Sequence, residues 1–215
     1  MKYNKFLYIY PPRPENAICP EEFDSWDNSP MIGQIKTNGS NTLIFTNGSD
    51  VKIMGRHKQL ISNVQISKRE IIESLYNPLN LNGGWVVLNA ECLNKNKLAE
   101  DNTPFNQKLI LFDILVYNSD YMVGRTFKER INLLDNLYGK VDSEKEYLYK
   151  ISKNIYRVKS YESGFSNLFN KFTSIDLVEG VVLKRSNAKL EVATSKNNNS
   201  RSQVKCRKGT KNYKY

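Results

Sequence analysis

The chain has 215 residues, 40% of them apolar, so it is long enough to bury a hydrophobic core in one large domain. Its formal net charge of +10 is uneven, because from Leu190 onward seven Lys or Arg stand against one acidic residue, Glu191. A polyanionic partner explains such a tail, with a merely solvated basic terminus as the alternative.

Cysteine usage and hydropathy restrict the class of protein further. Cys19, Cys92 and Cys206 are odd in number and lack the spacing of metal ligands, which favours reduced thiols over disulfides or a zinc site. No apolar run reaches the ~18 to 20 residues of a membrane span, and the N-terminus has no signal-peptide pattern. We therefore expect a soluble cytoplasmic protein without a membrane partner.

The first part of the chain predicts an extended arm followed by strands. Three prolines between residues 8 and 14 exclude a central strand there. Strands are expected at 32–36, 42–45 and 51–54 in one sheet, and Thr46-Asn47-Gly48-Ser49 is a hairpin turn signal between the last two. Lys36 would then end the first strand, and Arg56 would follow the third.

Two helices are predicted from their capping signals. Ser67-Lys68-Arg69-Glu70 and Thr126-Phe127-Lys128-Glu129 both have the capping-box pattern, and each is followed by apolar residues at helical spacing. Gly139 is the stop signal of the second helix. These segments are expected to be scaffold.

Apolar strands that contain a carboxylate are the unusual feature of the middle of the chain. Strands are predicted at 85–93 and 109–116, with Glu91 and Asp113 inside them. An unpaired carboxylate is costly to bury, so Glu91 either pairs with a cation or faces a cleft, and the sequence leaves both open.

The last part of the chain predicts a further carboxylate-bearing strand and a basic strand. Residues 142–153 are expected to be helical and exposed, 155–158 extended, 165–172 a short aromatic helix and 197–200 a loop. The strand at 177–185 contains Glu179, and alternation over 203–208 sends Lys205 and Arg207 to the same face. A single α+β domain accounts for these elements.

Lys36 is the candidate nucleophile of this set. Gly39 follows it closely and would let a phosphate approach the backbone. Like charge from Lys184, Lys205 and Arg207 would favour the neutral amine that can attack phosphorus. The carboxylates suit a divalent metal and a ribose hydroxyl.

The segments resemble, in order and content, the covalent nucleotidyltransferase superfamily of ATP-dependent polynucleotide ligases and mRNA capping enzymes. The resemblance covers about residues 32 to 208, and Asn38 replaces the usual acid of the lysine motif. The matching positions are Lys36 to Gly39, Arg56 in Gly55-Arg56-His57, Glu91, Phe112-Asp113 with the block from Gly124 to Arg130, Glu179 to Lys184, and Lys205 to Arg207.

The resemblance implies a role for each matching residue. Lys36 would become covalently adenylylated, Gln34 would read the adenine edge and Phe112 would stack on the base. Asp113 would orient its neighbours. His57 is assigned a surface or packing role, with a phosphate contact as the alternative. The implied ATP-binding set is Gln34, Lys36, Arg56, Glu91, Phe112, Lys184, Lys205 and Arg207. Glu91 and Glu179 would hold Mg²⁺ or Mn²⁺, and Asn41, Arg56, Lys208 and Lys211 would contact nucleic acid.

The resemblance also implies the fold and the substrate. We expect one α+β nucleotidyltransferase domain over 1–215, built of antiparallel β-sheets flanked by helices. It has an arm at about 1–30, a basic tail at about 196–215 and no OB-fold domain, whose work a partner domain or protein could supply. The expected substrate of the monomer is nicked duplex DNA. Asn41 favours an RNA ligase instead, and the sequence also leaves open a capping guanylyltransferase or a catalytically silent nucleic-acid-binding module.

Overall fold

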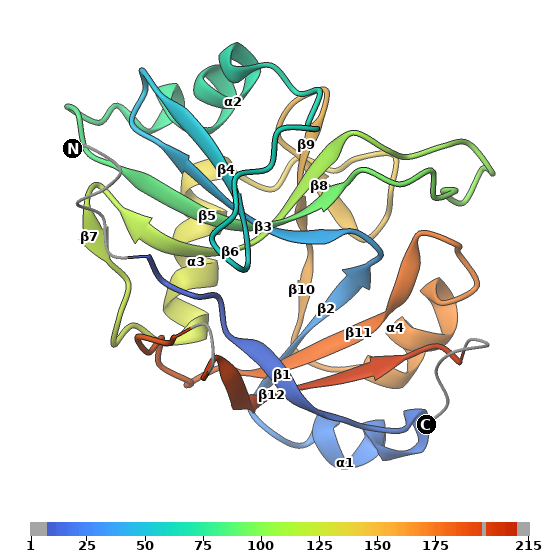
Figure 1. The fold of residues 1–215 in the computed structure, drawn as a ribbon. Helices are drawn as coiled ribbons and strands as arrows, with labels where there is room; N and C mark the ends of the chain where they lie inside the picture. Colours follow the sequence, from blue (N-terminus) through green and yellow to red (C-terminus); the bar gives the residue numbers. More distant parts are fainter. Residues whose placement is uncertain (1–7, 195–196, 210–215) are drawn as a thin grey trace.

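The computed structural model describes residues 8–194 and 197–209, which form two β-sheets with helices on their outer sides (Figure 1). The five-stranded sheet has the order β1-β12-β11-β2-β10. Its strands are β1 (Arg13–Ala17), β12 (Asn199–Arg207), β11 (Val178–Arg185), β2 (Met31–Thr37) and β10 (Ser160–Tyr161).

The seven-stranded sheet has the order β4-β3-β5-β6-β9-β8, with β7 paired to β6. Its strands are β4 (Val51–Gly55), β3 (Ser40–Thr46), β5 (Val86–Leu93), β6 (Lys108–Tyr117), β9 (Ile155–Val158), β8 (Leu148–Lys150) and β7 (Asp120–Tyr121). The pairing is antiparallel except between β6 and β9, and between β1 and β12 in the other sheet. The expected α+β fold is confirmed, but its sheets are mixed rather than purely antiparallel.

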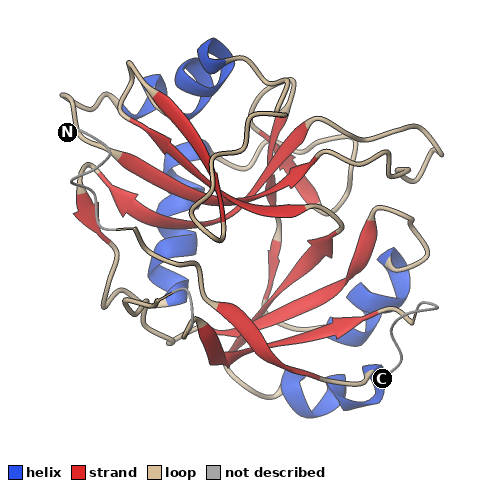
Figure 2. Ribbon diagram, viewed as in Figure 1, coloured by secondary structure: helices blue, strands red, loops and turns tan. Residues whose placement is uncertain are grey.

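The helices pack against the two sheets separately (Figure 2). α4 contacts β11 and β2 and is itself covered by α1, whereas α3 contacts β6 and α2 contacts β4. Their bounds are α1 (Phe23–Asp27), α2 (Lys68–Leu75), α3 (Phe127–Tyr138) and α4 (Phe165–Phe172), with 3-10 helices η2 (Pro20–Glu22) and η3 (Asn77–Leu79). Because the helices bury the outer faces, the inner faces are left for a cleft.

The connection between β2 and β3 takes the chain from one sheet to the other. The sequence predicted β2, β3 and β4 correctly as strands, but placing them in one sheet was wrong, because β2 belongs to the five-stranded sheet. Gly39 lies in this connection, where a Cβ atom would approach the Cys92 carbonyl oxygen to 2.6 Å. A glycine is therefore needed for the crossing to pass so close to β5. This crossing brings the end of β2 to the space between the sheets.

The N-terminal arm ends in an edge strand. As expected from its prolines, the segment does not form a central strand, since β1 pairs with β12 alone. Arg13 lies opposite Asn199 in this pair, and Figure 1 shows β1 and β12 side by side. The loop expected at 197–200 is wrong at its end, because β12 already begins at Asn199.

The helix expected at 142–153 is wrong. Leu148–Lys150 forms β8, which pairs antiparallel with β9. Tyr147 is fully buried, and the side chain of Lys145 is buried beside Glu100. The pairing of β8 with β9 and the burial of this segment in the core override its polar, helix-like local pattern.

The two capping signals have different outcomes. Thr126 and Glu129 form the reciprocal capping box at the start of α3, as predicted. Ser67 caps α2 by accepting a hydrogen bond from the Glu70 backbone N–H at 3.0 Å, but the Glu70 carboxylate turns away. It accepts from the Ser152 hydroxyl at 2.7 Å instead, and so ties α2 to the segment before β9.

The three cysteines all lie in the part of the chain that is described. Cys19, Cys92 and Cys206 are free thiols. No helix among residues 8–194 and 197–209 combines the length and the apolar character needed to cross a bilayer.

Candidate active site

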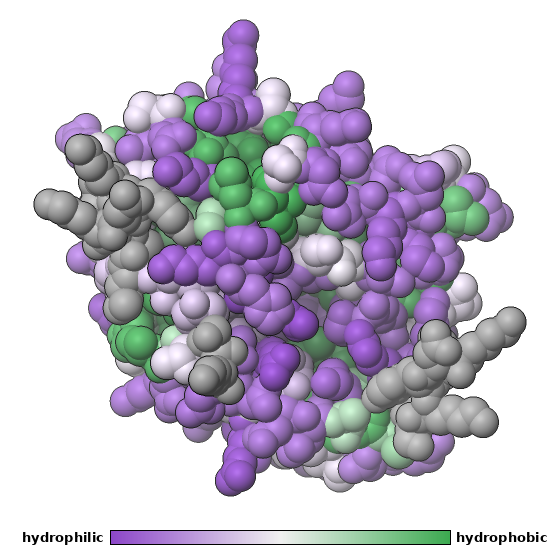
Figure 3. Space-filling view, viewed as in Figure 1, coloured by the Kyte–Doolittle hydropathy of each residue, from purple (hydrophilic) through white to green (hydrophobic). Residues whose placement is uncertain are grey.

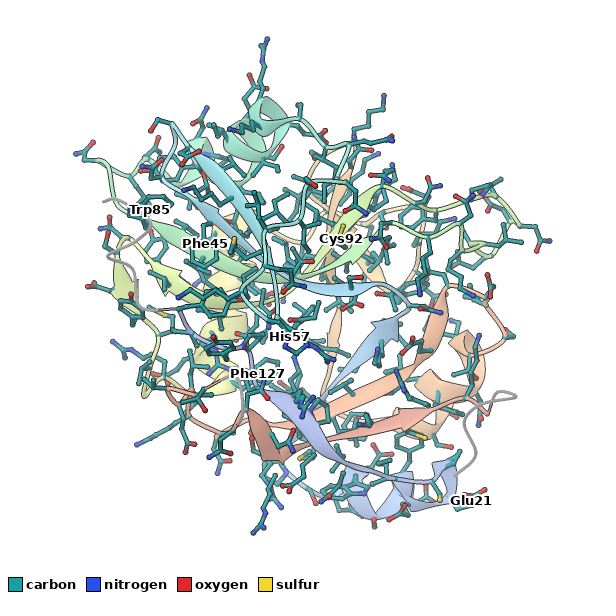
Figure 4. All side chains as sticks on the ribbon, viewed as in Figure 1. Glu21, Phe45, His57, Trp85, Cys92 and Phe127 are labelled. Carbon is teal, nitrogen blue, oxygen red and sulfur yellow. The ribbon has the colours of Figure 1, made fainter. Side chains whose placement is uncertain are left out.

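A cleft of about 1040 Å³ lies between the sheets and collects residues from both of them. Strands β2, β11 and β12 form one wall, strands β3, β5 and β6 form the other, and the segment after β4 lies at its edge. Figure 4 shows His57, from that segment, in the space between the two sheets. The face in Figure 3 is mostly hydrophilic, with separate small apolar patches. Charged side chains from both sheets line the cleft, so it is polar enough for a charged ligand.

Lys36 lies in the cleft with its ammonium bound to a carboxylate. Its Nζ atom is 2.5 Å from Oε2 of Glu179, and the same oxygen accepts from the Arg207 guanidinium at 2.8 Å. The strand register explains the bridge, because Gly180 pairs with Lys36 on one side and with Arg207 on the other. The two cations therefore flank the residue that follows Glu179.

Gly180 makes this close approach of strands possible. A Cβ atom on Gly180 would lie 1.9 Å from the Cys206 carbonyl oxygen, and the residue has a φ of +153°. Any other residue would push β12 away from β11. The Glu-Gly pair therefore sets the position of both the acid and the Arg207 strand.

Electrostatics at Glu179 favour its ionised form. Desolvation by itself would raise the pKa of this carboxyl, but the neighbouring Lys36 and Arg207 outweigh it and lower the pKa. Sequence reasoning grouped Lys36 with both cations and carboxylates, and the structure shows an ion pair between Lys36 and Glu179. Glu179 thus compensates the positive charge around the candidate nucleophile.

Glu91 faces the same region from the opposite wall. Its carboxylate accepts from the Gly39 backbone N–H at 3.1 Å, in the crossing segment just after Lys36. Desolvation, with a smaller contribution from the negative charge of Glu179, raises its pKa to about 7, although Lys36 acts in the other direction. The sequence left open whether Glu91 pairs with a cation or faces a cleft, and in the structure it faces the cleft.

Lys205 and Arg207 share one face of β12, and both line the cleft. The Lys205 ammonium has a 3.5 Å contact to the Pro14 carbonyl oxygen. Desolvation and the like charges of Arg207, Lys36 and Arg13 lower its pKa. Positive charge concentrated in this way suits a ligand with several phosphates.

A second cluster lies further along the same wall. Gln34 on β2 is buried and accepts from the Lys184 ammonium at 2.9 Å. Lys184 lies over the ring of Phe112, 4.8 Å from its centroid, and all three residues line the cleft. An aromatic ring beside a carboxamide can stack a base and read its edge.

Asp113 is held by a buried ion pair. Two bonds join its carboxylate to the Arg130 guanidinium, at 2.8 and 2.9 Å, and both side chains are buried. This pair accounts for the carboxylate inside the apolar strand. It agrees with the prediction that Asp113 orients its neighbours.

The predicted nucleic-acid contacts are dispersed. Asn41 and Arg56 line the cleft, and Arg56 donates to the His57 ring at 3.2 Å. Lys208 does not line it, since its ammonium donates to the carbonyl oxygens of Thr173 and Ile175. Lys211 lies outside the described residues. A nucleic-acid contact by any of these four residues stays a prediction.

Sequence reasoning missed several polar residues of the cleft. Arg13, Asn89, Asn94 and Gln203 all line it. Asn89 was detectable, because it lies two residues before Glu91 on one strand and so faces the same side. Arg13 had a weaker signal, since nothing local shows that the N-terminal arm pairs with the last strand.

The cleft offers two carboxylates as possible ligands of a divalent metal. No cluster of three or more His, Cys, Asp or Glu side chains that could hold a metal occurs in the described part of the chain. Glu91 and Glu179 both line the cleft and influence each other electrostatically. Mg²⁺ is commonly held by one or two carboxylates together with substrate phosphates, so these two residues fit a metal that arrives with a nucleotide.

Comparison with known proteins gives one family and several similar folds. The sequence model of the ATP dependent DNA ligase domain matches residues 16–200. The ligase domain of LigD from M. tuberculosis is 16% identical with a TM-score of 0.66, over 94% of this chain and 60% of that one. A mycobacterial DNA ligase D complexed with ATP and MES is 15% identical with a TM-score of 0.61, over 91% of this chain and 60% of that one.

A third similar structure is a Lig E DNA ligase described as binding DNA with a minimal scaffold. It is 13% identical with a TM-score of 0.53, and the match covers 84% of this chain and 62% of that one. The chain thus spans about three fifths of the length of these solved structures. No curated protein matches the sequence. At these identities the solved structures establish the fold alone.

Proposed function

Since the chain belongs to the ATP dependent DNA ligase domain family, we propose that it is an ATP-dependent polynucleotide ligase that works through a covalent lysyl-AMP. The observation that carries the proposal is the placement of Lys36. Its amine binds the carboxylate of Glu179, which also binds Arg207 on the basic face of β12, inside a cleft large enough for a nucleotide. Family membership alone would not identify the nucleophile.

The chemistry of the first step follows from these contacts. The neutral amine of Lys36 attacks the α-phosphorus of ATP, a P–N bond forms, the bond to the β-phosphate oxygen breaks, and pyrophosphate leaves. The proton of the amine is lost in this step. Lys205 and Arg207 bind the phosphate oxygens and stabilise the charge that develops on them. Gln34 and Phe112 hold the base, and Glu91 accepts hydrogen bonds from the ribose.

Glu91 and Glu179 would bind Mg²⁺ or Mn²⁺ together with the phosphates. When bound, the metal supplies positive charge that offsets the charge of the triphosphate and the leaving pyrophosphate. Occupation of Glu179 by a metal would also compete with its ion pair to Lys36. Glu179 would therefore pair with Lys36 in the free protein and help to hold the metal in the nucleotide complex.

The later steps transfer AMP to a 5′-phosphate, and a 3′-hydroxyl then displaces AMP to form the phosphodiester. We propose nicked duplex DNA as the substrate, since the matching family is that of DNA ligases. RNA-containing strands are the second candidate. The Oδ1 atom of Asn41 is buried without a hydrogen-bond partner among the described residues, so it can accept from a hydroxyl of a substrate. Arg56, at the edge of the cleft, would contact the incoming strand.

The setting of the enzyme belongs to the same proposal. Residues 1–215 would form one domain that acts as a monomer in the cytoplasm, with nucleic acid as its partner.

Covalent labelling tests the proposal. The protein is incubated with Mg²⁺ and ATP or GTP labelled in the α-phosphate, and then resolved on a denaturing gel. Label from ATP that disappears in Lys36→Met is expected. Label from GTP alone would indicate a capping guanylyltransferase. No label from either nucleotide, with a folded protein, would indicate a silent nucleic-acid-binding module.

A further inference from the structure

Gln34 has a carboxamide whose orientation is fixed from both sides. Its Oε1 atom accepts from the Lys184 ammonium at 2.9 Å. Its Nε2 atom donates to the Ser160 hydroxyl at 3.2 Å and to the Phe112 carbonyl oxygen at 3.4 Å. An ammonium can only donate and a carbonyl can only accept, so Lys184 and Phe112 each require the same orientation.

Lys184 is positioned to fix this orientation of the Gln34 carboxamide. Only 7% of the residue is exposed, and its ammonium lies 4.8 Å from the ring centroid of Phe112 and 4.6 Å from that of Phe127. Val182 pairs with Gln34 across β11 and β2, which puts Lys184 on the same sheet face two residues further along. Within the described residues, its hydrogen bond goes to Gln34 and no carboxylate lies within 4.0 Å.

Burial disfavours the charged form of Lys184. Desolvation lowers the pKa of Lys184 to about 8, although the nearby Asp113 favours the charged form. A buried ammonium keeps its charge more easily when a carbonyl dipole faces it. The contact with Gln34 therefore benefits the lysine as well as the carboxamide.

The fixed orientation has a consequence for a bound purine. The Nε2 hydrogens of Gln34 have partners in the protein, whereas its carbonyl oxygen has a second lone pair. At the edge of adenine an exocyclic amino group can donate to that lone pair. Guanine has a carbonyl oxygen in the corresponding place, so two acceptors would face each other without a hydrogen.

We propose that Lys184 is a positioning residue that holds the Gln34 carbonyl as the acceptor for a purine amino group and thereby makes the cleft select ATP over GTP. The inference rests on the proposed function, because it concerns the nucleotide that Lys36 attacks. It assigns to Lys184 a part in base selection rather than a direct contact with phosphate.

Replacing Lys184 tests the selection directly. In Lys184→Met only the longer 3.4 Å contact with the Phe112 carbonyl oxygen still requires this orientation. The carboxamide should then turn over more often and present Nε2 to the base, so GTP should gain and ATP should lose. The kcat/KM ratio of ATP over GTP for covalent labelling of Lys36 should fall roughly 5- to 100-fold, the effect of one mismatched buried hydrogen bond. Lys184→Arg, which again only donates, should restore part of the ratio.

A matched control distinguishes an effect on base selection from the general effect of removing a buried lysine. The side chain of Lys145 is also buried and lies 5.7 Å from an aromatic ring centroid, but Lys145 does not line the cleft. Lys145→Met should keep the wild-type ratio even if its melting temperature falls. A drop in the ratio equal to that of Lys184→Met would overturn the proposal.

A second variant keeps the test decisive if Lys184→Met does not fold. Gln34→Leu removes the reading group and leaves Lys184 in place, so its ratio should also fall. An unchanged ATP preference in Gln34→Leu, or an equal loss of both nucleotides in Lys184→Met, would overturn the assignment. Wild-type protein that takes label from neither nucleotide would instead contradict the proposed function.

Discussion

Oε2 of Glu179 lies 2.5 Å from Nζ of Lys36, so the candidate nucleophile of the free protein is held as half of an ion pair. An ammonium has no lone pair with which to attack phosphorus. The pair must therefore be loosened before the first step, and the phosphates or a metal that they bring are the groups able to do so. Several measurable consequences follow from this arrangement and its neighbours.

Glu179→Gln should impair adenylylation without unfolding the protein. The amide cannot pair with Lys36 and Arg207 as an ion, and it is a poor ligand for Mg²⁺. We expect the rate of covalent labelling from ATP to fall on the order of a hundredfold. Thermal melting should change little, because Glu179 is part-exposed in the cleft. Glu162→Gln, which removes an exposed partner of Lys128, is the matched control and should label at the wild-type rate. Labelling by Glu179→Gln at that same rate would contradict the assignment.

Glu91 should make the stability of the free protein fall as pH rises. Burial raises its pKa from the usual 4.5 to about 7, so between these values the folded protein binds a proton that the unfolded chain has lost. The free energy of unfolding therefore decreases over this range and levels off above pH 7, by at most about 3 kcal/mol.

Glu91→Gln should lack this slope. Urea denaturation at several pH values between 4.5 and 8, in EDTA and without nucleotide, measures it. The variant should gain stability relative to wild type as pH rises. Parallel stability curves for the two proteins would show that Glu91 is ionised throughout.

Gly180→Ala should destabilise the protein more than alanine at a glycine that has open space around it. A Cβ atom at Gly180 would lie 1.9 Å from the Cys206 carbonyl oxygen, whereas Gly83, which has a φ of +82°, has nothing within 4 Å of such an atom. We expect Gly180→Ala to lose roughly 1–3 kcal/mol more in free energy of unfolding than Gly83→Ala. Equal losses in chemical denaturation would mean that β11 and β12 can separate at no cost.

The Asp113–Arg130 pair should behave as one unit. Replacing one partner leaves a buried charge uncompensated, so Asp113→Asn and Arg130→Met should each cost about 3 kcal/mol or more. The double variant should be less destabilised than the sum of the two, since it leaves neither charge behind. Denaturation of the four proteins completes the cycle, and additive losses would show that the pair contributes no coupling.

The sequence predicted local structure well where one pattern decides it. Strand runs around Glu91 and Asp113 and the start of α3 at Thr126 lie where the residues indicated. Apolar periodicity and caps are properties of a short segment, so they can be read without knowing the fold. Residues 142–153 failed for the opposite reason, because Tyr147 and Leu148 are buried in a core cluster with residues from distant parts of the chain.

Part of the cleft lining was predictable from the sequence, but the contacts within it were not. Lys36, Glu91, Glu179 and Lys205 all line one cleft. That Lys184 binds Gln34, and that Glu70 joins Ser152 rather than closing a capping box, depends on which strands become neighbours. Nothing in the local sequence shows that the chain changes sheets after Lys36, so the shape of the cleft could not be inferred.

The pairing of β1 with β12 affects how the protein is made. Arg13 and Asn199 are 186 positions apart in the chain, yet they lie opposite each other at the edge of one sheet. During synthesis, β1 stays without its partner strand until β12 has emerged from the ribosome. Since β12 also carries Lys205 and Arg207, the phosphate-binding side of the cleft is incomplete in a nascent chain until that strand joins the sheet. Closure of this long loop is therefore expected to be a slow folding event.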